Sequence, residues 1–229
     1  MQRQELAARY LDGQMGRRVF LRRLVGLGVA LPAALAYADL LRADPAAAAA
    51  YDYYVYVQDY SYNLKSTRLA SFGQTVEWGG FFSQGGHTHS ATDPTAWINS
   101  GFKTGGSAYD LQMAFSGTFK YRCAETTHPL SPMNGNIKVP MVVSPAGGPL
   151  GTVFTLGWSS ISGLSEYSFD VQRRRPSDAG FVNWIRRTST RGIQYTPNAK
   201  GTYRFRARTR NTATGVVSAW SPVLSISVT

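Results

Sequence analysis

Short runs in which apolar and polar residues alternate recur from residue 51 to the C-terminus, and they constrain the fold more than any other feature of the chain. The apolar residues of 75–78 (TVEW) and 111–115 (LQMAF) fall on every second position, as in a half-buried strand. Residues 51–57 read as a further, buried strand, and no run of ten residues in 51–144 has helical apolar spacing. With 23 glycines and 13 tyrosines, the pattern predicts an all-β protein.

The composition bounds what such a protein can be. At 229 residues with 43% hydrophobic residues, the chain is long and apolar enough to pack a core and to form one or two domains. It contains a single cysteine. One thiol excludes both a disulfide-stapled mini-protein and a cysteine-rich zinc module, because each needs several.

The N-terminal segment has the features of an export signal. Residues 16–22 read GRRVFLR, an apolar run follows at 24–36, and Ala36-Tyr37-Ala38 supplies a small-x-small cleavage site. This arrangement resembles a twin-arginine signal peptide, which implies removal of residues 1–38 and a mature protein in the periplasm, cell envelope or medium. The apolar run of about thirteen residues is shorter than a bilayer-spanning helix. An uncleaved membrane anchor and a soluble amphipathic helix are the alternatives.

Composition shifts divide the remainder of the chain. Residues 39–50 form an alanine-rich segment, predicted to be a linker. A turn-forming stretch of proline and glycine at 145–149 predicts a second linker, so that 51–144 and 150–229 would form two β domains.

The positive charge is distributed unevenly. The formal net charge of +11 first suggests nucleic-acid binding. However, residues 51–144 carry six basic and six acidic residues, whereas 145–229 carry eleven and three. The first domain is therefore neutral, and the basic surface belongs to the second domain.

The lone cysteine lies in a segment rich in metal-binding side chains. Cys123 ends a predicted strand whose apolar residues alternate with Lys120 and Arg122, and His128 and Met133 follow within one loop. A pair of histidines, His87 and His89, lies upstream. Copper favours a trigonal arrangement of one thiolate and two imidazoles with a weak axial thioether. A structural zinc site would present four strong ligands and no thioether.

Residues 51–143 resemble a cupredoxin of the plastocyanin, amicyanin and auracyanin kind. The resemblance rests on GQTVEW at 73–78, HSATD at 89–93, INSG at 98–101 and the spacing Cys-x4-His-x4-Met. It implies a Greek-key β-sandwich that binds one type 1 copper through His89, Cys123 and His128, with Met133 as the axial ligand. His87 is the alternative first ligand. The loop is longer than in most small plastocyanin-like domains and closer to those of auracyanin and rusticyanin.

Residues 150–229 resemble a fibronectin type III-like β-sandwich. The matching segments are 156–158, 167–174, 201–208 and 218–222. In that family Trp158 and Tyr203 would lie in the core, and the third strand (167–174) and the sixth (201–208) would be neighbours.

The arginines of the second domain form clusters that one sheet face could share. They are Arg173, Arg174 and Arg175, Arg186, Arg187 and Arg191, and an outward row of Arg204, Arg206, Arg208 and Arg210. Such a face could bind an anionic envelope polymer or an acidic redox partner protein, in preference to nucleic acid. The alternative is a solvated face that discourages edge aggregation.

The sequence thus predicts an exported, two-domain blue copper protein that carries single electrons and turns over no substrate. It lacks the extra histidine clusters of multicopper oxidases and shows no serine-histidine-acid or paired-carboxylate arrangement. Two alternatives are a copper-binding or storage protein without electron transfer, and an envelope adhesion protein built on a cupredoxin scaffold.

Overall fold

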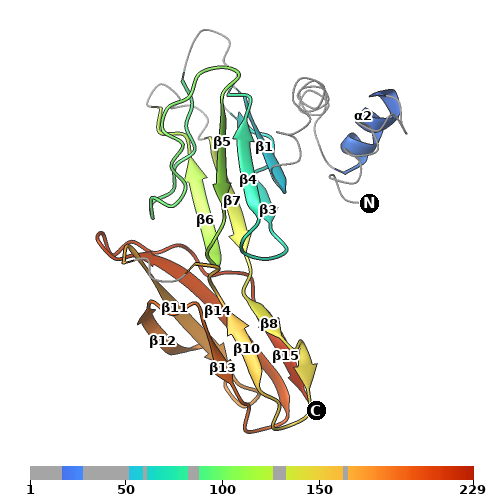
Figure 1. Ribbon diagram of the computed structural model, residues 1–229, viewed down its shortest axis with the longest axis vertical. Coiled ribbons are helices and arrows are strands. Elements are labelled where there is room, and N and C mark those ends of the chain that lie inside the picture. The colour runs from blue at the N-terminus through green and yellow to red at the C-terminus, as the bar shows by residue number, and fades with distance from the viewer. Residues whose placement is uncertain (1–16, 28–51, 59–60, 82–87, 126–132, 162–164) are drawn as a thin grey trace.

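A computed structural model describes residues 17–27, 52–58, 61–81, 88–125, 133–161 and 165–229 (Figure 1). Within these residues the only helix is α2 (Arg17–Gly26), and all other regular elements are strands. The predicted all-β class is confirmed. The strands gather into four sheets, which form two sandwiches stacked end to end along the long axis of the molecule.

The N-terminal sandwich comprises β1 to β7. One sheet has the order β2-β1-β4-β5 and the other the order β3-β7-β6. The strands are β1 (Tyr53–Gln58), β2 (Ser61–Tyr62), β3 (Ser66–Arg68), β4 (Thr75–Gly79), β5 (Ala108–Gln112), β6 (Gly117–Arg122) and β7 (Asn134–Val139). Rings from both sheets meet in the core, where Trp78 of β4 contacts Tyr121 of β6 edge to face at 5.4 Å between ring centroids.

The C-terminal sandwich comprises β8 to β15. Its sheets have the orders β13-β10-β8 and β12-β11-β14-β15-β9. The strands are β8 (Val142–Ser144), β9 (Gly147–Gly148), β10 (Phe154–Gly157), β11 (Tyr167–Arg174), β12 (Val182–Thr188), β13 (Gly192–Tyr195), β14 (Gly201–Asn211) and β15 (Leu224–Val228). Trp158 and Tyr203 are fully buried, as expected. The expected neighbours β11 and β14 pair antiparallel over eight residues.

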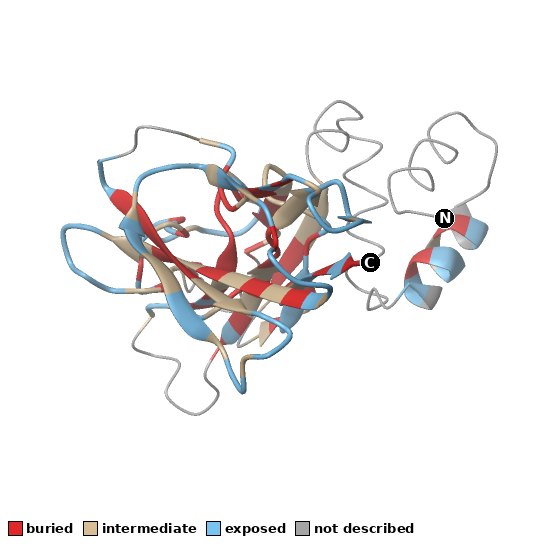
Figure 2. Ribbon diagram, turned by 90° about the horizontal axis from the view of Figure 1, so that it is seen from below, coloured by how far each residue is buried: buried red, intermediate tan, exposed pale blue. Residues whose placement is uncertain are grey.

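Burial alternates along the strands as the sequence pattern predicts (Figure 2). In β6 the side chains of Phe119 and Tyr121 point into the core, whereas Lys120 and Arg122 are exposed. Side chains on successive residues of a strand lie on opposite faces, so this alternation fixes which face of β6 meets the core.

One predicted strand ends earlier than expected. Alternation continues to Phe115, but β5 ends at Gln112. Beyond it the chain crosses to the C-terminal sandwich, where Phe115 forms a β-bridge with Ser159. Phe115 is fully buried against Tyr167 and Phe169 of β11, with ring centroids 5.2 and 5.4 Å away. Burial between the sandwiches therefore replaces the sheet pairing that the pattern predicted.

The two sandwiches share an extensive contact. The backbones of Thr118 and Ala219 exchange two hydrogen bonds of 2.9 and 3.0 Å, and the Thr118 hydroxyl donates to the carbonyl of Trp220 at 2.8 Å. The Thr209 hydroxyl also donates to the carbonyl of Ser116 at 3.1 Å. Buried apolar residues run from one sandwich into the other without interruption.

The described part of the N-terminal segment is short. It consists of α2 and the residue after it, with Phe20 and Leu24 buried. The predicted cleavage site at 36–38 and the linker at 39–50 lie outside the described residues. None of the described helices has the length and apolarity needed to cross a bilayer.

Candidate metal centre

His89 lies in an ordered segment that runs alongside the N-terminal sandwich. Its backbone exchanges two hydrogen bonds with Lys103, of 3.0 and 2.7 Å, which hold the segment in an extended conformation. The His89 side chain is fully buried, and its Nδ1 atom is shielded from solvent. Burial is consistent with a structural or ligand role and excludes a freely solvated surface histidine.

Cys123 directly follows β6 and is partly buried against the core. The backbone amide of Ser90 donates a hydrogen bond to Cys123 Sγ at 3.3 Å. The Ser90 hydroxyl accepts a hydrogen bond from the amide of Ala124 at 2.9 Å and lies 3.9 Å from the same sulfur. The residue after His89 therefore contacts the thiol through both its amide and its hydroxyl.

A short backbone ladder fixes the two segments relative to each other. Thr92 and Arg122 exchange two backbone hydrogen bonds of 3.0 and 2.9 Å, and the Thr92 hydroxyl donates to the Arg122 carbonyl at 3.3 Å. Arg122 directly precedes Cys123, and Thr92 lies three residues after His89. This pairing sets the register in which the histidine and the cysteine meet.

Met133 is joined to Cys123 through its backbone. It is 3% exposed, and its carbonyl accepts a hydrogen bond from the amide of Cys123 at 3.1 Å. The next residue pairs with Arg122 at the start of β7. The loop from Cys123 to Met133 thus begins and ends at one backbone contact.

The structure brings His89, Cys123 and Met133 to the same end of the N-terminal sandwich. His128, within 126–132, and His87, within 82–87, lie outside the described residues. Within the described ranges no three His, Cys, Asp or Glu side chains converge as a metal-binding group. The donor set of an imidazole, a thiol and a thioether fits a soft metal such as copper better than magnesium or calcium, which prefer oxygen ligands.

Two residues near the thiol were not singled out as functional in the sequence. Ser90 supplies the amide described above, and the Tyr62 hydroxyl donates a hydrogen bond to the Ser90 carbonyl. Burial, and then the neighbouring Cys123, raises the pKa of Tyr62 above its usual range, so this phenol remains a neutral donor. The only available signal for Ser90 was its position next to His89.

The arginine row of β14 is largely engaged by its own sheet. The guanidinium of Arg206 lies between the rings of Phe181 and Trp220, 4.2 and 5.1 Å from their centroids. Arg208 stacks on Trp220 at 4.6 Å and donates to the Asp170 carboxylate at 3.0 Å. These contacts cover aromatic surface on the outer face of the sheet, so part of the row is structural.

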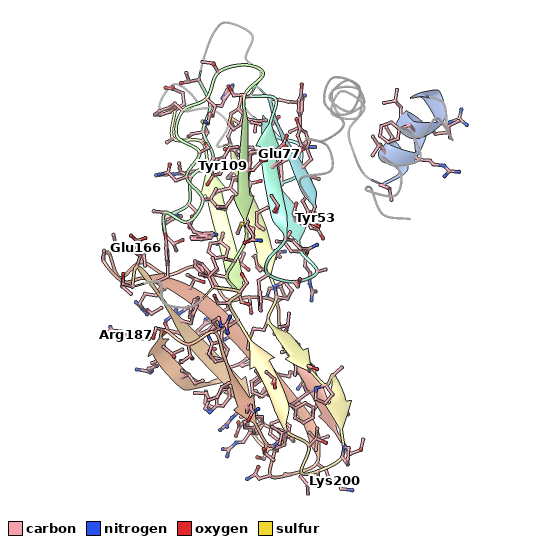
Figure 3. All side chains as sticks on the ribbon, in the orientation of Figure 1. Tyr53, Glu77, Tyr109, Glu166, Arg187 and Lys200 are labelled. Carbon is pink, nitrogen blue, oxygen red and sulfur yellow. The ribbon has the colours of Figure 1, made fainter. Side chains whose placement is uncertain are left out.

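The remaining basic residues lie around this structural part. Arg174 of β11 and Arg204 of β14 are directly opposite each other in the pairing of the two strands. Arg186 and Arg187 on the edge strand β12 are exposed. Figure 3 labels Arg187 on this strand. Arg174 and the arginine row of β14 therefore share one face of this sheet, as expected.

The fold and the site together define an all-β protein of two sandwiches, one of which places a histidine, a cysteine and a methionine at one end. No family model and no curated protein matches the chain. Amicyanin from Paracoccus versutus (Thiobacillus versutus) is a solved structure similar to it, with 22% identity, a TM-score of 0.30, and coverage of 38% of this chain and 78% of that chain.

Two further solved structures are similar to the chain. The chicken interferon gamma receptor alpha chain is 14% identical, with a TM-score of 0.32 and coverage of 64% of this chain and 86% of that chain. The Clostridium thermocellum CbhA fibronectin(III)-like modules are 12% identical, with a TM-score of 0.23 and coverage of 72% and 89%. At such identities and TM-scores the likeness carries no information on function.

Proposed function

We propose that this protein is an exported type 1 copper protein that carries one electron at a time between redox partners of the cell envelope. The observation that carries the proposal is the 3.3 Å hydrogen bond from the Ser90 amide to Cys123 Sγ, which joins the segment of the buried His89 to the strand of the only cysteine. Copper in such a site alternates between two oxidation states and so carries one electron.

The chain supplies the ligands and their orientation. His89, Cys123 and His128 would hold the metal as strong donors, and the Met133 thioether would be a fourth, weaker donor. The Ser90 amide orients the thiol sulfur, and the backbone bond between Cys123 and Met133 keeps the two ends of the ligand loop together. A preset geometry means that little rearrangement accompanies a change of oxidation state. In this role the protein would convert no substrate.

Visible absorption tests the metal assignment. Cu(II) added to the purified mature protein is expected to give an intense band at about 600 nm, where thiolate-to-copper charge transfer absorbs. Cys123→Ser should abolish it. A colourless or pale complex that Cys123→Ser leaves unchanged would overturn the assignment. Separate His87→Ala and His89→Ala variants decide which histidine is the first ligand.

The methionine has a matched control within the same sandwich. Met133 and Met113 are both buried, but the Met133 carbonyl accepts a hydrogen bond from the Cys123 amide, whereas the Met113 carbonyl accepts one from the Gly73 amide. Met133→Leu should move the absorption band and the reduction potential, whereas Met113→Leu should leave both unchanged. Equal effects of the two variants would remove Met133 from the ligand set. Reversible one-electron voltammetry of the loaded protein would then distinguish an electron carrier from a copper store.

Export is the second part of the proposal. It rests on the arginine pair, the short apolar run and the cleavage site at 36–38. Expression in a bacterial host with the twin-arginine pathway should yield a periplasmic protein whose N-terminus begins at residue 39. Replacement of Arg17 and Arg18 by Lys should retain the precursor in the cytoplasm. A full-length protein in the periplasm would argue for an uncleaved anchor.

The basic face of the C-terminal sandwich is proposed to dock an anionic envelope polymer or an acidic redox partner. Arg206 and Arg208 are poor probes because they also cover Trp220. Arg204→Ser with Arg186→Ser is preferable, because neither change disturbs these stacked rings. The double variant should elute earlier from an anionic resin than Lys120→Ser with Lys138→Ser, which removes the same charge from the N-terminal sandwich. Equal elution of the two double variants would show that these arginines do not form an anion-binding surface.

A further inference from the structure

The segment that follows His89 contacts the C-terminal sandwich at one backbone atom. The carbonyl oxygen of Thr95 accepts hydrogen bonds from Asn211 Nδ2 at 3.0 Å and from the Tyr167 hydroxyl at 3.4 Å. Thr95 is 1% exposed. Tyr167 begins β11 and Asn211 ends β14, and the two residues pair directly with each other. One corner of the C-terminal sandwich therefore binds this carbonyl.

Asp93 makes the turn around Thr95 stiff. One carboxylate oxygen accepts hydrogen bonds from the amide and the hydroxyl of Thr95, at 2.8 and 2.5 Å. The other accepts from the amide of Ile98 at 2.7 Å. Asp93 itself is 7% exposed. A displacement of Thr95 would thus be transmitted to Asp93, and from there to Thr92, which pairs with Arg122.

An aromatic cluster strengthens the same contact. The ring of Trp97 lies 4.2 Å from that of Phe115 and 5.4 Å from that of Tyr167, measured between centroids. Such packed aromatic pairs stabilise beyond the area they bury. The turn is therefore attached to the C-terminal sandwich by apolar packing as well as by hydrogen bonds.

The strand that leads to Cys123 is attached to the same sandwich. Thr118, near the start of β6, pairs with Ala219 through its backbone, and Cys123 directly follows the end of β6. Both segments that meet at the Ser90 to Cys123 hydrogen bond therefore rest on the C-terminal sandwich, one through Thr95 and the other through Thr118.

We infer that the C-terminal sandwich positions the metal-binding segments, with Asn211 and Tyr167 acting as positioning residues for His89 and Cys123 through Thr95. This role is additional to docking and requires no partner. As far as it concerns the metal, it rests on the proposed function. The two sandwiches would then act as one unit in metal binding.

Two conservative variants test the contact. Asn211→Asp keeps the side-chain oxygen that accepts from the amides of Ala213 and Thr214, but it places a carboxylate oxygen against the Thr95 carbonyl. Tyr167→Phe removes only the hydroxyl and keeps the ring. Asn183→Asp on β12 is the matched control, because it adds the same charge and keeps the oxygen that accepts from Gln172.

Hydrogen exchange of the metal-free full chain is the first measurement. In the double variant Asn211→Asp with Tyr167→Phe, the amides of residues 90–100 should exchange roughly fivefold to tenfold faster than in the parent, while those within β14 do not change. Asn183→Asp should match the parent throughout. Unchanged exchange in 90–100 would overturn the inference.

The copper-loaded protein provides the second measurement. The double variant should shift the visible band and release copper to a chelator several-fold faster than the parent and the control. A blue parent whose band and release are the same in the double variant would overturn the role in positioning the metal. A parent that never turns blue, with faster exchange in the variant, would overturn the proposed function and leave the contact between the sandwiches supported.

Discussion

Glu77 and Asp110 lie directly opposite each other on the neighbouring strands β4 and β5. Glu77 is only 6% exposed. Burial, and then the charge and hydrogen bond of Asp110, raise the pKa of Glu77 to about 8. Gly79, two residues along the strand, leaves space for the Tyr54 hydroxyl and Glu77 Oε1, which would lie 2.7 and 2.9 Å from a Cβ atom at that position. Figure 3 shows Glu77 and Tyr109 on these adjacent strands.

This pair should make the stability of the protein depend on pH. The pKa of Glu77 is higher in the folded state than the value of about 4.3 expected on unfolding, so folding favours the protonated carboxyl. The stability that this raised pKa gives the folded protein is complete below the pKa of the unfolded state. It is lost as the pH rises through about 8. We expect the free energy of unfolding, measured with urea, to fall between pH 5 and pH 9.

Glu77→Gln removes the titrating carboxyl and should flatten this dependence, with its largest gain over the parent at pH 9. The exposed Glu166 provides the control, and Glu166→Gln should retain the slope of the parent. A Glu77→Gln slope equal to that of the parent would show that this pair does not titrate with folding.

Asp170 should have the opposite pH dependence. It is 5% exposed, and burial alone would raise its pKa, but hydrogen bonds from Arg210, from the Arg187 amide and from Arg208 outweigh burial and lower the pKa. A carboxyl with a lowered pKa stabilises the folded state at every pH above its unfolded-state pKa of about 3.9. This stability is lost as the pH falls through the pKa of the folded state. Asp170→Asn should cost roughly 2 kcal/mol at pH 7, between an exposed and a fully buried pair.

Acid unfolding followed by tryptophan fluorescence checks this prediction. Compared with the parent, Asp170→Asn should lose less stability between pH 5 and pH 2. The pair of Arg175 and Asp178 provides a comparison, since its partners are three residues apart on the surface. Asp178→Asn should cost much less at pH 7 than Asp170→Asn. Equal costs would show that Asp170 is not a structural centre of the arginine face.

Local patterns were sufficient for the strands and the core of this protein. Alternation predicted β4 and β6, and it predicted which residues of β6 are buried. The tryptophan and tyrosine of the second sandwich, Trp158 and Tyr203, are in the core as expected. These features depend on neighbours in the sequence and on the two-residue repeat of a strand, which a single sequence displays directly.

Contacts between distant residues could not be predicted in this way. Nothing in the local sequence shows that Phe115 leaves its sheet, or that Asn211 reaches Thr95, 116 residues away. The arginine row on β14 was correctly assigned to one face, but its stacking on Trp220 depends on where a separate segment folds back. At the metal centre, the sequence pointed to the ligand types but not to the Ser90 amide, because backbone donors leave no residue signature.

The Ser90 hydroxyl should stabilise the metal-free site. Ser90 is 1% exposed, and its hydroxyl accepts the 2.9 Å hydrogen bond from the Ala124 amide. Ser90→Ala leaves that amide without this partner but keeps the amide of residue 90 beside Cys123 Sγ. We expect a loss of about 1–2 kcal/mol in urea unfolding.

Ser66→Ala is the control for this change. The Ser66 hydroxyl donates a solvent-exposed hydrogen bond of 2.9 Å to the side-chain oxygen of Asn136, so the free energy of unfolding of Ser66→Ala should lie within about 0.5 kcal/mol of that of the parent. If Ser90→Ala is as mild as Ser66→Ala, water replaces the hydroxyl at Ala124 and the site is more open than its burial indicates.

Gly117 should prove essential to the contact between the sandwiches. A Cβ atom at this position would lie 2.5 Å from the Ser218 hydroxyl oxygen and 3.3 Å from the ring of Phe119. The Ser218 hydroxyl cannot move away freely, because it accepts from the Thr209 amide at 3.1 Å. Gly117→Ala should therefore cost about 1–3 kcal/mol, whereas Gly180→Ala, with open space around it, should be nearly neutral.

A double-mutant cycle attributes this cost to the contact itself. Ser218→Ala alone removes the acceptor of the Thr209 amide and should cost about 1 kcal/mol. When it is combined with Gly117→Ala, the added methyl group gains room, so the double variant should lose at least about 1 kcal/mol less than the two single losses together. Strict additivity would mean that Gly117→Ala acts on the core of the N-terminal sandwich through Phe119. A positive coupling would instead show that the start of β6, the strand leading to Cys123, is held by the C-terminal sandwich.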